Sequence, residues 1–254
     1  MTVLIGILCE DGVVVGSDSS ATSAINPTIK TIETEALKIE ILHGNVITAT
    51  TGAVGLAQRF YDEVDRFFEF IQTPHTPAAP APVGFPPGLI PQNPLQQVMA
   101  RVPAGQTPLA ALSAVEIGTM LSERVVANFR RTTGIIQNNQ GWGLGALVAF
   151  ANNEPQLLEF EAIQFHPELK GTPDPSRGDR VWRAASMGSG QMLADSFSAH
   201  AYRLLFGTRL PRIDRAKLVV SWARHTLQYR RHRWTAADGG FRENGRGRLA
   251  GCPR

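Results

Sequence analysis

The chain has 254 residues, of which 43% are hydrophobic and 19% are charged, as is typical of a globular protein with a substantial core. A formal net charge of only +3 argues against a nucleic-acid partner, and no segment approaches the roughly 18 apolar residues of a membrane helix. Two cysteines cannot build a disulfide framework and acidic residues interrupt the first apolar run too early for a signal peptide, so we expect a cytoplasmic protein with no membrane partner.

The first elements along the chain are predicted to be strands. Asp11-Gly12 is a turn dipeptide, and it separates two runs rich in β-branched residues, which predicts a hairpin. The two strands of this hairpin are Val3–Leu8 and Val13–Ser17. A second hairpin is predicted from the runs Leu37–Leu42 and Val46–Thr50.

Helical patterns follow the four strands. Apolar residues spaced three and four apart predict an amphipathic helix from Val54 to Ile71. Residues 73–108 contain ten of the seventeen prolines, which excludes a helix or a central strand and predicts an extended insertion. Thr107 and Pro108 then resemble an N-cap with proline at the first helical position, which predicts a helix as far as Phe129.

The second half of the chain repeats the order of strands before helices. Because paired helices follow runs of strands, the pattern predicts an α+β fold rather than alternating parallel units. The predicted strands are Gly143–Ala151, Gln156–Phe165 and Arg180–Ala185, and the predicted helices are Ser189–Phe206 and Ile213–Arg230.

A set of residues near the start of the chain suggests nucleophilic chemistry. If the initiator Met is removed, Thr2 carries both a hydroxyl nucleophile and a free amine of pKa about 7.7–8.0, and that amine can accept the hydroxyl proton. Asp18 and Lys38 are candidate charge partners that would favour the ionised hydroxyl, although each is also typical of a turn or a strand edge. Gly52, where a strand passes into a helix, is a candidate oxyanion donor or a simple turn residue.

Four stretches together resemble the catalytic β subunits of the proteasome, among the N-terminal-nucleophile hydrolases. They are IGILCEDGVVVGSDSSAT, LKIEIL, VITATTGAVGLAQRF and AASMGSGQMLADS, and the resemblance extends over residues 2–230. It implies that Thr2 is the nucleophile, Asp18 and Lys38 its charge partners and Gly52 the oxyanion donor. Ser189 would help to move the proton of the terminal amine, although Gly-Ser-Gly before a helix is also found in phosphate-binding loops.

The resemblance also implies an architecture and a specificity pocket. The fold would be a four-layer αββα sandwich formed by a single domain over residues 1–254, with the Pro-rich insertion 73–108 and an irregular Arg-rich tail 231–254. The positions that match the family's specificity pocket suggest a modest, partly polar pocket. They are Ala21, Thr22, Ala36, Glu40, Thr50 and Val54.

The implied activity is that of a threonine endopeptidase without cofactor or metal. Family members form rings whose sites face an inner chamber, so we expect homo-oligomeric rings, two of them stacked, that cleave peptides or unfolded proteins. The chain resembles a bacterial β-only homologue, and an ATPase or unfoldase is a candidate partner. The first two helices would face the end of the ring, with the insertion 73–108 covering that surface.

The sequence departs from the family after the last predicted helix. Catalytic members carry an Asp and a Ser there, whereas this chain reads RWTAADG, in which Thr235 or Asp238 would have to substitute. The residues after Gly240 also lack the period-two pattern of the expected final strands. Two alternatives therefore stay open: a non-proteolytic amidohydrolase of the same fold, and an inactive ring-forming scaffold.

Overall fold

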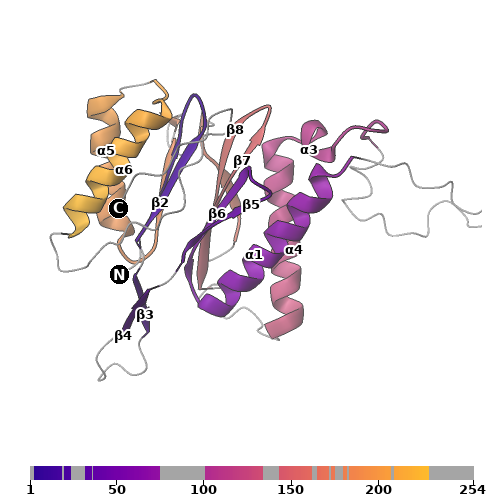
Figure 1. Ribbon diagram of the computed structural model, residues 1–254, viewed down its shortest axis with the longest axis horizontal. Helices are drawn as coiled ribbons and strands as arrows, with labels where there is room; N and C mark the ends of the chain where they lie inside the picture. The colour runs from indigo at the N-terminus through magenta and orange to yellow at the C-terminus, as the bar shows by residue number, and fades with distance from the viewer. Residues whose placement is uncertain are drawn as a thin grey trace, which may run out of the picture.

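The computed structural model has a mixed α+β fold, as the order of the predicted elements indicated (Figure 1). It describes residues 3–18, 20–23, 32–35, 37–74, 101–133, 143–161, 165–171, 173–174, 180–181, 183–206 and 209–228. Most of the Pro-rich insertion and the whole Arg-rich tail lie outside the described residues. Thr2 and Ala36 lie outside them as well.

The larger sheet has five antiparallel strands in the order β5-β6-β7-β8-β9. Its first pair, β5 and β6, is the second predicted hairpin, with Leu42 opposite Val46. The strands are β5 (Ile39–Leu42), β6 (Val46–Gly52), β7 (Leu144–Asn152), β8 (Glu154–Phe160) and β9 (Pro167–Leu169).

The smaller sheet has three antiparallel strands in the order β12-β1-β2. The first predicted hairpin is confirmed, since β1 (Leu4–Leu8) pairs with β2 (Val13–Ser17) and Leu8 lies opposite Val13. On the other side of β1 lies β12 (Ala184–Met187), with Met187 opposite Leu4. Two short pairs complete the strands: β3 (Ser20–Ser23) with β4 (Ile32–Glu35), and β10 (Pro173–Asp174) with β11 (Arg180–Val181).

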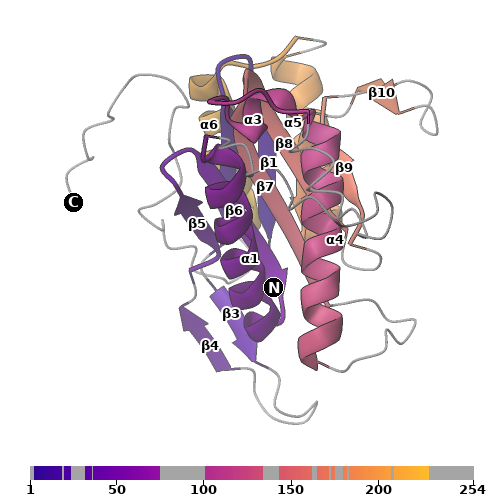
Figure 2. The same cartoon turned by 90° about the vertical axis from the view of Figure 1, so that its right-hand side faces the viewer.

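Five helices are present in the described part of the chain, and four of them cover the two sheets. Figures 1 and 2 show α1 and α4 on the outer side of the five-stranded sheet and α5 and α6 on the outer side of the three-stranded sheet. The helices are α1 (Val54–Gln72), α3 (Pro108–Ala111), α4 (Ala114–Thr133), α5 (Gln191–Leu205) and α6 (Ile213–Gln228). None of these described helices is long and apolar enough to cross a membrane.

Three apolar clusters hold these elements together, because successive residues of a strand point to opposite faces. In β6, Val46 packs toward α1 and α4, whereas Ile47 and Ala49 pack between the two sheets. A third cluster joins the three-stranded sheet to α5 and α6. The cluster under α1 and α4 is rich in fully buried phenylalanines, namely Phe60, Phe67, Phe68, Phe129, Phe150, Phe160 and Phe165.

The predicted helix from Thr107 to Phe129 is wrong, because the chain forms two helices there. Thr107 makes no side-chain cap, and α3 ends after four residues. Ser113 then starts α4 with a capping box: its Oγ accepts from the Glu116 N–H at 3.2 Å, and Glu116 Oε2 accepts from the Ser113 N–H at 2.9 Å. These reciprocal bonds satisfy amide donors that a helix continuous with α3 would not expose.

Two strand boundaries also differ from the predictions. The strand predicted to reach Phe165 ends at Phe160, and Phe165 has a positive φ of 56°, which turns the chain into the unpredicted edge strand β9. The predicted strand Arg180–Ala185 is divided between β11 and β12. The short strands β3 and β4 were not predicted, because their polar sequences SATS and IETE lack an apolar face.

Candidate active site

The buried carboxylate of Asp18 lies at the end of β2, next to the first described residue, Val3. Asp18 follows β2 directly and is only 3% exposed. Its N–H donates to the carbonyl of Val3 at 3.1 Å, and its Oδ1 accepts the N–H of Val3 at 2.8 Å. The residue that precedes Val3 in the sequence is Thr2, so Asp18 holds both peptide groups of the residue next to the predicted nucleophile.

Lys38 meets the same carboxylate oxygen from the other sheet. It directly precedes β5, and its Nζ donates to Asp18 Oδ1 at 2.8 Å. The exposed fractions of the two side chains are 9% for Lys38 and 5% for Asp18. The ion pair therefore joins the edge strand of the three-stranded sheet to the edge strand of the five-stranded sheet in a largely dry environment, where charges interact more strongly than at a surface.

Helix α1 fixes the backbone that carries Lys38. The carbonyl of Lys38 accepts the N–H of Thr50 at 3.1 Å and the hydroxyl of Tyr61 at 2.9 Å. Thr50 Oγ1 and Tyr61 Oη are 2.6 Å apart, so the three residues form one bonded unit. Burial raises the pKa of Tyr61 to about 12, so the phenol keeps its proton as a donor.

Tyr61 was not predicted as part of the site. The sequence pattern placed it among the apolar positions of the α1 helix, and it is indeed only 7% exposed. A buried tyrosine nevertheless requires a partner for its hydroxyl, and that requirement is the signal that would have directed attention to this residue.

Gly52 lies at the end of β6, two residues beyond Thr50, and its conformation demands glycine. Its φ is +116°, and an added Cβ would lie 1.9 Å from the carbonyl oxygen of Gly143. The next residue, Ala53, is the N-cap of α1 and forms no side-chain cap hydrogen bond. The start of α1, with the positive end of its dipole, therefore lies at the end of β6, beside the beginning of β7.

Ser189 reaches the same end of the three-stranded sheet. It is exposed in the bend between β12 and α5, after Gly188 with φ +99°. Because Met187 lies opposite Leu4 in β1, this bend is placed at the end of the sheet where Val3 precedes Leu4. A hydrogen bond joins the two elements on either side of this bend: Ser186 of β12 is buried, and its Oγ donates to Asp195 of α5.

The predicted pocket residues that the structure describes lie on different elements, and their role in a specificity pocket stays a prediction. Glu40 and Thr50 both turn toward α1: Thr50 bonds Tyr61 and is 4% exposed, and the pKa of Glu40 is raised by burial and then by Asp62 and Asp65 of α1. Val54, at the start of α1, is 63% exposed. Ala21 and Thr22 lie in β3, where the structure describes the backbone alone.

Asp18 and Lys38 form an ion pair, and Gly52 and Ser189 follow from strands that end at the same end of the two sheets. The catalytic roles of these four residues stay predictions. Within the part of the chain that the structure describes, no three His, Cys, Asp or Glu side chains are grouped to hold a metal ion. A scan against protein-family models finds no match to the chain, and a search of curated proteins finds none.

Proposed function

We propose that the chain is a threonine peptidase of the N-terminal-nucleophile type, in which Thr2 becomes the first residue and attacks the scissile carbonyl. The observation that carries this proposal is the bonding of Asp18 to both Val3, the residue next to Thr2, and Lys38. A buried ammonium beside a hydroxyl favours its ionised form, and the carboxylate keeps that ammonium charged and in place.

The proposed reaction is an acyl transfer in two steps. Thr2 Oγ forms a bond to the carbonyl carbon while its proton passes to the α-amine of the same residue, and the leaving amine departs with that proton as the peptide bond breaks. Water then attacks the ester on Thr2, giving its proton to the α-amine and regenerating the hydroxyl. As written, the reaction needs neither cofactor nor metal.

The other site residues are assigned supporting roles. The N–H of Gly52 would stabilise the oxyanion of each tetrahedral intermediate, assisted by the dipole of α1. Ser189 would pass protons to and from the terminal amine. Lys38 keeps its position through the bonds of its carbonyl to Thr50 and Tyr61.

The proposal extends to fold and assembly. We assign the fold to the four-layer αββα sandwich, supported by the helix pairs on the outer side of each sheet (Figure 1). The hypothesis also includes an assembly, in which the chain forms stacked homo-oligomeric rings in the cytoplasm. These rings would act on peptides or unfolded proteins with an ATPase or unfoldase partner. Large apolar side chains stand exposed on α5 and α6, as a self-association surface requires; they are Met192, Leu204, Leu205, Leu218 and Trp222.

The intact mass of the purified protein, before and after reaction with a peptide epoxyketone, tests the function. This reagent reacts with a threonine that has both a hydroxyl and a free amine. We expect a mass without Met1 and one adduct per chain, and we expect both adduct and peptide cleavage to be absent in Thr2→Ala. Thr2→Ser is the matched control, because it keeps the hydroxyl and should keep the adduct.

Other results would favour the alternatives. A chain that retains Met1 and forms no adduct would contradict the peptidase proposal and favour the ring-forming scaffold. An adduct together with cleavage of small amides, but not of peptides, would favour the amidohydrolase. Peptide cleavage retained in Thr2→Ala would refute the assignment of the nucleophile.

A further inference from the structure

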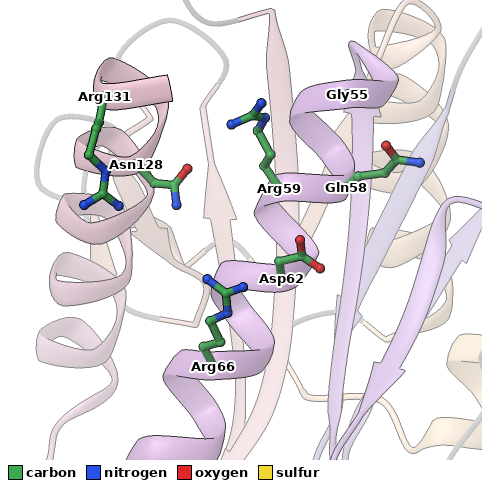
Figure 3. Close-up of a pocket in the computed structure, with 7 residues that line it drawn as sticks. All are labelled: Gly55, Gln58, Arg59, Asp62, Arg66, Asn128 and Arg131. Carbon is green, nitrogen blue, oxygen red and sulfur yellow. The ribbon is translucent and has the colours of Figure 1, made fainter. Parts of the chain in front are cut away.

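A groove of about 570 Å³ runs between α1 and α4 on the outer side of the five-stranded sheet (Figure 3). Three of the side chains that line it are arginines, namely Arg59 and Arg66 of α1 and Arg131 of α4, whereas Asp62 is its one acidic lining residue. In Figure 3, Arg59 and Arg66 extend toward α4, whereas the Asp62 side chain points away from α4. The groove therefore presents a concentration of positive charge.

The three arginines have no carboxylate partner within the described residues. No ion pair joins Arg59, Arg66 or Arg131 to an acidic side chain there. Guanidinium groups gathered in a hollow repel one another and create a local positive potential, which an incoming anion would relieve.

Three acidic side chains of α1 close to Arg59 and Arg66 in sequence have other neighbours, and one of them, Asp65, forms an ion pair with His43 at 3.0 Å. Glu63 is buried and already accepts from Arg124 at 2.8 Å and from Asn128 at 3.0 Å. Asp62 lines the groove and also helps to raise the pKa of Glu40 in β5. Asp62 offsets part of the positive charge, but three guanidinium groups against one lining carboxylate leave the groove positive.

The spacing of the arginines indicates a ligand with more than one anionic group. Arg59 and Arg66 are seven residues apart on one helix, which corresponds to about 10 Å along its axis. A single phosphate or carboxylate would engage one end of this row, whereas a linear polyanion would engage both ends with the bidentate bonds that guanidinium groups favour.

The chemistry of the lining favours a small polyanion over a protein segment. Every residue that lines the groove is polar or glycine. Protein and peptide partners are usually held by a buried aromatic or aliphatic anchor, and such an anchor has no apolar pocket to enter here. We infer that the groove between α1 and α4 is a binding site for a linear multivalent phosphate compound, held by Arg59, Arg66 and Arg131.

Calorimetric titration with inorganic tripolyphosphate tests this inference on the full chain. Binding is expected to be saturable and to weaken as salt is added. The double variant Arg59→Gln/Arg66→Gln is expected to bind about a hundredfold more weakly, since one charge-assisted bond accounts for about tenfold. Arg130→Gln is the matched control, because Arg130 is an exposed neighbour of Arg131 that does not line the groove, and it should bind as the parent does.

The alternatives give distinct results. Absence of binding, or an equal loss in Arg130→Gln, would overturn the inference, the second by showing attraction to net charge alone. Tighter binding of a short polyglutamate peptide than of tripolyphosphate would overturn the assignment to phosphate and indicate an acidic protein segment. If the double variant fails to fold, Arg66→Gln replaces it, since Arg66 is exposed and its loss should still weaken binding about tenfold.

The measurement is independent of the proposed peptidase function. Binding in Thr2→Ala should equal that of the parent chain, because the groove lies on the side of α1 away from Tyr61 and Lys38. Failure of the peptidase proposal would therefore leave this result intact, and the reverse also holds. Binding in the groove would instead count against the expectation that the insertion 73–108 covers the surface of α1 and α4.

Discussion

Removing the charge of Lys38 should destabilise the fold far more than removing a surface cation. In Lys38→Met, the side chain keeps most of its length, but Asp18 loses the ammonium that lies 2.8 Å from its Oδ1. The carboxylate keeps the N–H of Val3 as a donor, yet its charge stays buried without a counter-charge. Breaking a buried ion pair on one side typically costs about 3–5 kcal/mol, whereas an exposed pair contributes about 0–1 kcal/mol.

The free energy of unfolding in urea, measured at several protein concentrations to separate folding from assembly, gives the magnitude. Arg212→Met is the matched control, because its pair with Asp11 spans 3.5 Å and the Arg212 side chain is 76% exposed. The double variant Asp18→Asn/Lys38→Met should recover much of the loss, since no charge then remains buried. A loss below about 1 kcal/mol in Lys38→Met would refute the view that this pair is a buried structural link between the sheets.

Three further perturbations follow from the geometry. Tyr61→Phe removes the hydroxyl that donates to the carbonyl of Lys38. We expect the free energy of unfolding to fall by about 1–3 kcal/mol and, under the proposed peptidase function, kcat to fall at unchanged KM. Equal peptidase activity would contradict the role of Tyr61 in positioning Lys38. Gly52→Ala places a methyl group 1.9 Å from the carbonyl oxygen of Gly143 at φ +116°. Urea denaturation should therefore show a free energy of unfolding lower by at least about 2 kcal/mol, and an unchanged value would show that the strand end adjusts to the methyl group. Ser113→Ala should cost about 1 kcal/mol. The loss of stability in Ser113→Ala should become smaller in acid, because bonds to Ser113 lower the pKa of Glu116. The stability that these bonds contribute is present above the ordinary carboxyl pKa and disappears as the Glu116 carboxylate of the folded state is protonated. A loss that is constant from neutral to acidic pH would count against the capping box.

The parts of the fold that the sequence predicts well are those coded by local pattern. Alternating β-branched runs around Asp11-Gly12 specify the β1–β2 hairpin, and the three-and-four spacing of apolar residues specifies α1 to within one residue at its end. Both signals are contained in a window of about 20 residues or fewer, so they need no knowledge of the tertiary neighbours.

The start of α4 shows where local signals compete. Thr107-Pro108 and Ser113-x-x-Glu116 are both recognised helix starts, and they lie six residues apart. The capping box prevails for the long helix because it satisfies two amide donors at once, whereas Thr107 bonds none with its side chain. Sequence alone does not rank the two signals.

The candidate site depends on contacts between the two sheets, which no spacing in the sequence defines. The resemblance to a known family brought Asp18 and Lys38 together, and the structure joins them across β2 and β5. The same resemblance assigned Glu40 and Thr50 to a specificity pocket, which stays a prediction, and in the structure both side chains lie on the face of the sheet that α1 covers. A position in a strand fixes which face a side chain takes only once the neighbouring layer is known.

The start of α1 lacks a side-chain cap, and this links the stability of the helix to the proposed peptidase activity. Ser, Thr, Asp or Asn at an N-cap typically adds about 1 kcal/mol over alanine, yet position 53 holds alanine with no side-chain cap. A capping side chain there would occupy the amide groups that an oxyanion would otherwise approach. If the proposed peptidase function holds, Ala53→Asp should stabilise the fold and lower peptide cleavage, and selection for cleavage would keep the weaker helix end.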